Sequence, residues 1–261
     1  MAVLKLLLAY DGTGFQGFAR QPGGRTVEGA LLGALERIMG SSPRLSVAGR
    51  TDAGVHAEGQ VVSFQADAEP QRVQRVLNGM LAPEVVVRGA SLAPAGFDAR
   101  RSATARSYRY RIRVAGVADP FTARYEWHRP GRLAVSPMRR AAGFLVGEHD
   151  FASFCRPPKD GRPTVRRLER LSVRPAGEVL EIGARAESFL HQMVRSLVGT
   201  LVAVGEGRLT PEAMPTILAA RDRAAAGPIA PPHGLTLVSV HYGVHPRARG
   251  RSRAGAKPGE R

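Results

Sequence analysis

The chain has 261 residues, of which 43% are hydrophobic, so it is long enough to bury a sizeable core in one large domain or two closely packed small ones. Its apolar runs are short and interrupted, far below the roughly 20 residues of a membrane-spanning helix, so no membrane association is expected. Lys and Arg number 38 against 22 Asp and Glu, and the resulting net charge of +16 favours a polyanionic partner such as nucleic acid.

The single cysteine, Cys155, cannot form an internal disulfide, which fits a reducing compartment. The apolar stretch at the N-terminus has no basic leader, so we expect no secretory signal and a cytoplasmic protein. The His-x-Glu and Pro-Cys-x-x-Cys pair of zinc deaminases is absent, as is the Gly-Lys-Ser/Thr ending of a phosphate-binding loop. The sequence therefore predicts no metal site.

The predicted elements of the first half follow a β-α-β-β-α-β order. A helix that Thr26 caps and Gly40 ends follows the first strand, and a glycine-rich loop over 49–59 separates the two middle strands. The strands are predicted over 2–9, 45–48, 60–65 and 85–92, and the second helix over 71–80.

The same order is predicted again in the second half. Strands are expected over 103–114, 165–173, 179–186 and 236–242, and helices over 136–145, 189–204 and, as an addition, 211–220. This repetition indicates an α+β fold of two ferredoxin-like, RRM-like halves in tandem, residues 1–102 and 103–243, with their sheets side by side or forming one surface. A cleft between the halves is the expected ligand site. Residues 244–261 are predicted to be a disordered basic tail.

The segment Gly49-Arg50-Thr51-Asp52-Ala53-Gly54-Val55-His56 gives the strongest indication of chemistry. A carboxylate between two strands, with glycines on both sides, is presented outside the sheet, and the glycines let a planar ligand approach the backbone. Asp52 can therefore act as a nucleophile or a base. Taken alone, an Asp in a glycine-rich turn more often bonds the backbone of its own turn.

The whole string resembles the signature of the tRNA pseudouridine synthase A family, and further similarities extend along nearly the whole chain. They lie at Tyr10-Asp11-Gly12 with Phe15 and Gly17, and at 97–100, 102–110, 189–195 and 198–199. The resemblance implies an isomerase that converts uridine to pseudouridine at positions 38 to 40 of the tRNA anticodon stem-loop. It also implies a homodimer in which one subunit holds the tRNA body while the other catalyses.

In that family the Asp of the motif is the catalytic residue, which corresponds to Asp52. The reaction detaches uracil from ribose at N1, turns it and rejoins it through C5, so it requires no cofactor and no metal but does require a carboxylate beside the sugar and base. Asp52 can attack C1′ of the ribose, remove the C2′ proton, or attack C6 of the uracil, and the sequence leaves all three open.

Tyr108 and Arg195 complete the predicted catalytic set. The resemblance places Tyr108 against the flipped uracil, where stacking contributes roughly 1–3 kcal/mol and its hydroxyl is a candidate to deprotonate C5. The alternative is a tyrosine that fills the core of a strand. Arg195 stands among apolar residues, where a charge needs a partner. Asp52 is the natural partner and the resemblance implies this pair, while solvent or a phosphate are the alternatives.

Substrate contacts are expected from five side chains: Arg20, Arg50, His56, Arg106 and Tyr108. Together with other arginines they can follow an RNA backbone, with salt-dependent binding. His191 lies four residues before Arg195, on the same face of the predicted helix. We expect His56 and His191 to be structural or RNA-lining residues rather than acids or bases.

Two other functions fit parts of the sequence. A noncatalytic RNA-binding protein with two RRM-like sheets is disfavoured because the aromatic-rich RNP1 string is absent. An RNA glycosidase that uses Asp52 would release free uracil instead of rejoining it.

Overall fold

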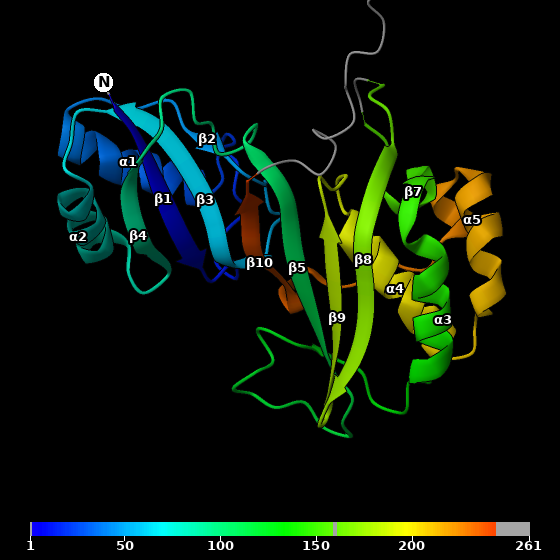
Figure 1. Ribbon diagram of the computed structural model, residues 1–261. Helices are drawn as coiled ribbons and strands as arrows, with labels where there is room; N and C mark the ends of the chain where they lie inside the picture. Colours follow the sequence, from blue (N-terminus) through cyan, green and yellow to red (C-terminus); the bar gives the residue numbers. More distant parts are fainter. Residues whose placement is uncertain (1, 159–160, 244–261) are drawn as a thin grey trace, which may run out of the picture.

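The computed structural model describes residues 2–158 and 161–243, so the basic tail predicted over 244–261 lies outside the described residues. Within the described ranges, ten strands form a single mixed sheet that runs through both halves of the chain (Figure 1). Of the two arrangements that the sequence leaves open, the structure has the continuous surface. No helix in these ranges is long and apolar enough to cross a membrane.

The first half contains four strands and two helices in the predicted order. They are β1 (Ala2–Tyr10), α1 (Val27–Met39), β2 (Ser46–Val47), β3 (His56–Ala66), α2 (Pro70–Leu81) and β4 (Val85–Ala93). Alternate leucines of β1 are fully buried in a core shared with α1 and α2, and each such burial contributes about 1.5–3 kcal/mol. The predicted helix ends are confirmed, because Thr26 accepts a hydrogen bond from the Gly29 N–H and Gly40 takes a left-handed φ of 73°.

The second half repeats that order and adds short elements. Its strands are β5 (Ala103–Arg113), β6 (Trp127–His128), β7 (Gly147–Asp150), β8 (Val165–Ala176), β9 (Val179–Ala186) and β10 (Leu235–Tyr242). Its helices are α3 (Val135–Leu145), α4 (Met193–Gly205) and α5 (Met214–Ala220), with 3₁₀ turns η1 (Ala152–Phe154), η2 (Pro211–Ala213), η3 (Arg223–Ala225) and η4 (Pro232–Gly234). A second core packs α3, α4 and α5 against β5, β8 and β9, and Tyr108 contacts both cores.

The two halves have the same strand order. It is β4-β1-β3-β2 in the first half and β10-β5-β9-β8 in the second. The halves join where β10 runs parallel to the start of β3, with Thr236 opposite His56. The strand β2 pairs with a later part of β3, where Val47 lies opposite Val62. The loop from β2 to β3 therefore leaves the sheet beside the junction of the halves.

Two predicted boundaries are wrong. The helix predicted over 189–204 begins only at Met193, because Gln192 has a left-handed φ of 62° that an α-helix cannot contain. His191 thus precedes the helix and does not share a helical face with Arg195. The strand predicted from Gln60 already begins at His56, because the first residues of β3 gain β10 as a neighbour. That pairing joins segments far apart in the sequence.

Candidate active site

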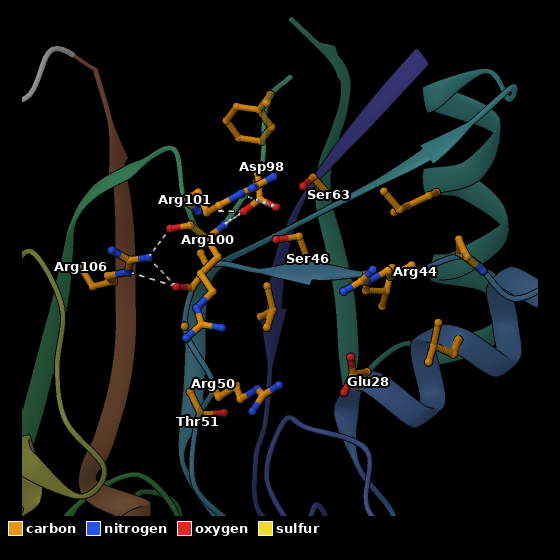
Figure 2. A pocket seen from close by; sticks show the side chains of 18 of the residues that line it. Glu28, Arg44, Ser46, Arg50, Thr51, Ser63, Asp98, Arg100, Arg101 and Arg106 are labelled. Carbon is orange, nitrogen blue, oxygen red and sulfur yellow. Dashed lines mark hydrogen bonds and ion pairs between the residues drawn. The ribbon is translucent and has the colours of Figure 1, made fainter. Parts of the chain in front are cut away.

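A groove of about 2240 Å³ lies at the junction of the two halves. The first half contributes residues 43–52 and part of α1, and the second half contributes Tyr108 and the segment 188–195. Figure 2 shows part of this groove, in which Arg44 and Glu28 lie across from Arg100 and Arg106. Residues from both predicted halves therefore face one cavity.

Asp52 and Arg195 meet at the surface of this groove. Arg195 Nη1 donates a hydrogen bond of 3.0 Å to Asp52 Oδ2, and the side chains are 14% and 24% exposed respectively. Arg195 Nε also donates to the Ala230 carbonyl at 2.8 Å, which fixes the guanidinium from its other side. A charge-assisted bond of this kind holds a carboxylate in one orientation and stabilises its negative charge. The pair predicted from the sequence is present.

A buried polar network holds the loop that carries Asp52. Gln60 is fully buried, and its side chain donates to the Gly49 carbonyl at 2.5 Å and accepts from the Gly49 N–H at 3.3 Å. Tyr10 Oη lies 2.8 Å from the Thr51 hydroxyl and accepts from Gln60 Nε2 at 3.3 Å. Both ends of the segment Gly49–Thr51 are therefore fixed just before Asp52. Sequence reasoning missed Gln60, although its place on the inward face of an alternating strand was a usable signal.

Tyr108 lies beside this loop at the junction of the two cores. A Cβ atom at Gly49 would lie 3.6 Å from Tyr108 Oη, so the hydroxyl is close to the glycine backbone. Its ring meets that of Phe189 edge to face, with centroids 5.1 Å apart. Burial raises the pKa of Tyr108 well above the ordinary value of a tyrosine. The hydroxyl is therefore protonated at neutral pH.

His191 approaches the other oxygen of Asp52. Its Nε2 lies 3.4 Å from Asp52 Oδ1, and its side chain is 50% exposed. The backbone carbonyl of His191 accepts from the Arg156 N–H at 3.1 Å, which fixes the turn ahead of α4. The structure thus brings His191, Asp52 and Arg195 together, although His191 is not on the helix as predicted.

His56 follows the loop that carries Asp52, but unlike Asp52 it is not among the residues that line the groove. Its ring is 4% exposed, and Nδ1 accepts from the Gly12 N–H at 3.0 Å and lies 3.1 Å from an Asp11 carboxylate oxygen. Its Nε2 lies 2.9 Å from the Arg124 carbonyl and 3.1 Å from that of His233. These bonds indicate that His56 anchors the end of the loop to neighbouring segments.

The three arginines predicted to contact substrate have different surroundings. Arg20 and Arg50 are exposed, and Arg50 lines the groove. Arg106 is buried, and its guanidinium donates to the carbonyls of Ala48, Arg100, Ala103 and Glu187. Two of these acceptors are visible as dashed bonds in Figure 2. Arg106 therefore ties the strands beside the groove together and has its donors directed at protein backbone.

Among residues 2–158 and 161–243, no group of three or more His, Cys, Asp or Glu side chains is placed to hold a metal ion. Cys155 is fully buried, and burial raises the pKa of its thiol. Among the described residues, a geometry suited to chemistry is found around Asp52, where Arg195 and His191 meet its carboxylate.

Comparisons with known proteins match the sequence of this chain to one class of enzyme. A family model described as tRNA pseudouridine synthase matches residues 141–243. The tRNA pseudouridine synthase A of Frankia casuarinae is 49% identical over 95% of this chain and 92% of its own length. Those of Moorella thermoacetica and Geotalea daltonii are 44% and 41% identical, each over 93% of this chain and all of their own length.

Among solved structures, a complex of Cbf5, Nop10 and Gar1 matches 76% of this chain and 45% of its own, with 13% identity and a TM-score of 0.33. A similarity that low supports no inference about function. The similarity to curated relatives, in contrast, covers nearly the whole chain, and it defines the class as the tRNA pseudouridine synthases. Within that class the chain belongs to the tRNA pseudouridine synthase A family.

Proposed function

We propose that this chain converts uridine to pseudouridine at positions 38 to 40 of tRNA anticodon stem-loops, with Asp52 as the catalytic residue. Membership in the family makes it a tRNA pseudouridine synthase, an isomerase, as the resemblance implied. The Asp52–Arg195 pair is the observation that carries the site assignment, because it joins two distant sequence motifs at 3.0 Å in the groove.

The two carboxylate oxygens have different tasks in this proposal. Arg195 binds Oδ2, so Oδ1 is the oxygen available to the substrate. Oδ1 either attacks C1′ and forms a glycosyl ester, attacks C6 of the uracil, or removes the C2′ proton. After detachment at N1, the uracil turns and bonds to C1′ through C5. The carboxylate is regenerated in each of these routes, so one Asp suffices for the whole cycle.

Tyr108 receives the flipped base in this proposal. Extruding a uridine from its stack costs a few kcal/mol, and contact with an aromatic ring returns roughly 1–3 kcal/mol of it. The place of Tyr108 supports the assignment, because it lines the groove together with Gly49 and Asp52. Phe189 fixes the plane of the Tyr108 ring from one edge.

RNA binds along the groove through its backbone in this proposal. Arg50 is exposed and lines the groove, and Arg20 is exposed on the loop before α1. Affinity for tRNA is expected to fall steeply as salt rises, because lysine and arginine contacts release counterions. If the dissociation constant for tRNA, measured by filter binding, stays the same between 50 and 200 mM salt, the electrostatic contribution is rejected.

Several further properties accompany the activity. We propose that residues 1–102 and 103–243 are ferredoxin-like halves with the active-site cleft between them, which the identical strand order of the halves supports. We also propose a cytoplasmic homodimer in which one subunit holds the tRNA body while the other catalyses. Light scattering on the purified protein, with and without tRNA, tests the dimer, and a monomeric mass at micromolar concentration contradicts it.

One assay separates the proposed function from its alternatives. Unmodified tRNA with C5-tritiated uridine is incubated with the wild type and with Asp52→Asn, and both tritiated water and free uracil are measured. Isomerisation releases tritium without free base, and Asp52→Asn abolishes the release. Free uracil would instead indicate a glycosidase, and binding without release would indicate a noncatalytic RNA-binding protein. Release that persists in Asp52→Asn would remove Asp52 from the catalytic position.

A further inference from the structure

For one proton transfer in the proposed reaction, the sequence suggests only the hydroxyl of Tyr108. When C5 has bonded to C1′, C5 still carries its hydrogen and N1 is doubly bonded to C6. A base must take the C5 proton, after which the C5–H electron pair forms the C5=C6 double bond. The electron pair of the N1=C6 bond moves onto N1, which takes a proton from water. The step is a tautomerisation, so no oxidant, reductant or group carrier is needed.

Tyr108 is poorly suited to take this proton. Burial raises the pKa of its hydroxyl well above the ordinary value of a tyrosine. A phenol that stays protonated at neutral pH can donate a hydrogen bond to the uracil but is a weak proton acceptor. In this proposal Tyr108 stacks on the uracil and takes no proton from it.

Asp52 is also constrained in this step. Its Oδ2 is bonded to Arg195, and its Oδ1 is the atom that reacts at the sugar or base. A second group that faces the same space as Oδ1 is needed if the sugar chemistry and the C5 deprotonation are to be separate. Within the described part of the chain, the one other titratable side chain in contact with this carboxylate is His191.

His191 has the geometry and chemistry of a base. Its Nε2 lies 3.4 Å from Asp52 Oδ1, and both residues line the groove. A uracil positioned at Asp52 therefore lies within reach of the imidazole. Neutral imidazole is the side chain best matched to proton transfer near neutral pH. The ring is half exposed, which lets a proton taken from C5 pass into solvent.

We propose that His191 is the base that removes the C5 proton of the rejoined uracil and passes it to water. This inference rests on the proposed pseudouridine synthesis and adds a catalytic residue to it. The backbone that carries His191 is held in place, because the His191 carbonyl accepts from the Arg156 N–H and the Leu190 carbonyl from the Met193 N–H, both at 3.1 Å.

The test uses tRNA with protium or deuterium at C5 and compares wild type, His191→Gln and His191→Ala. His149→Gln is the matched control, because His149 is a histidine of β7 whose Nε2 contacts the nearby Val146 carbonyl. Loss of the base is expected to slow pseudouridine formation by ~10²–10⁴-fold, the usual contribution of general base catalysis. Deprotonation then limits the rate, so a primary deuterium isotope effect appears in both variants and is small in the wild type.

Chemical rescue separates a base from a structural residue. Added imidazole is expected to restore part of the activity of His191→Ala, since the half-exposed site is open to a small base. Activity within threefold of wild type, or a loss with neither isotope effect nor imidazole rescue, overturns the assignment to His191. If the wild type forms no pseudouridine, the proposed function itself fails. Wild-type synthesis with unaffected His191 variants rejects only this inference.

Discussion

Replacing Gln60 with Leu is expected to loosen the loop that carries Asp52. The change is close in volume but removes both bonds to Gly49 and the bond to Tyr10 Oη. Each net hydrogen bond contributes about 1 kcal/mol, and each buried backbone group left unpaired costs about 1–3 kcal/mol. With two such groups on Gly49, the free energy of unfolding should fall by about 3–5 kcal/mol, a large part of the stability of an ordinary domain.

Urea unfolding at 25 °C measures this loss, with Gln65→Leu as the control because Gln65 lies on the same strand but is exposed. The control should stay within about 0.5 kcal/mol of wild type. In the folded Gln60→Leu protein, kcat should fall on the order of 10-fold to 100-fold with little change in KM, because the carboxylate loses its fixed position. A stability loss below about 1 kcal/mol together with an unchanged kcat would refute the reasoning.

Four other substitutions test the remaining features. Arg195→Ala should lower kcat on the order of 10²-fold, because the Asp52 carboxylate loses its charged donor, while tRNA affinity in a filter-binding assay changes little. A kcat within threefold of wild type contradicts this. Tyr10 has a pKa raised to about 12 by burial, so its share of stability is complete below pH 10 and is lost as pH rises toward 12, about 3 kcal/mol in all. Thermal melts should show that Tm falls less between pH 8 and pH 11 for Tyr10→Phe than for wild type. Equal falls in Tm would contradict the raised pKa of Tyr10. At Gly199 of α4 a Cβ would lie 1.7 Å from a backbone carbonyl oxygen, so Gly199→Ala should lower the free energy of unfolding, measured in urea, by at least about 3 kcal/mol. Gly33 lies in the middle of α1 with open space around it, so Gly33→Ala should raise the free energy of unfolding by up to about 1 kcal/mol. Equal effects of the two glycine substitutions would show that the close approach at α4 relaxes freely.

Most of the fold could be predicted from local sequence patterns. Alternation along β1 and β9 and the caps at Thr26 and Gly40 are determined by neighbouring residues, so the sequence alone could predict them. The start of β3 could not be found in this way, because it depends on pairing with β10 some 180 residues later. The left-handed backbone at Gln192 also escaped prediction, since a glutamine gives no local signal for that conformation.

The candidate site also contains features that the sequence could predict and features that it could not. Asp52 and Arg195 could be paired because a lone charge in an apolar stretch requires a partner and the motif supplied one. The surroundings of Arg106 could not be inferred, because the carbonyls that surround it come from four separate positions of the chain. Basic composition alone does not distinguish an arginine that binds RNA from one that binds its own backbone.

The place of β10 in the sheet has a consequence for how the enzyme matures. During synthesis, the segment with Asp52 emerges long before the segment with Arg195, and the strand that joins their halves emerges later still, as residues 235–242. A nascent chain that lacks this strand has both chemical groups but no sheet to hold them at 3.0 Å. The juxtaposition of Asp52 and Arg195 therefore depends on a strand that follows both of them in the sequence.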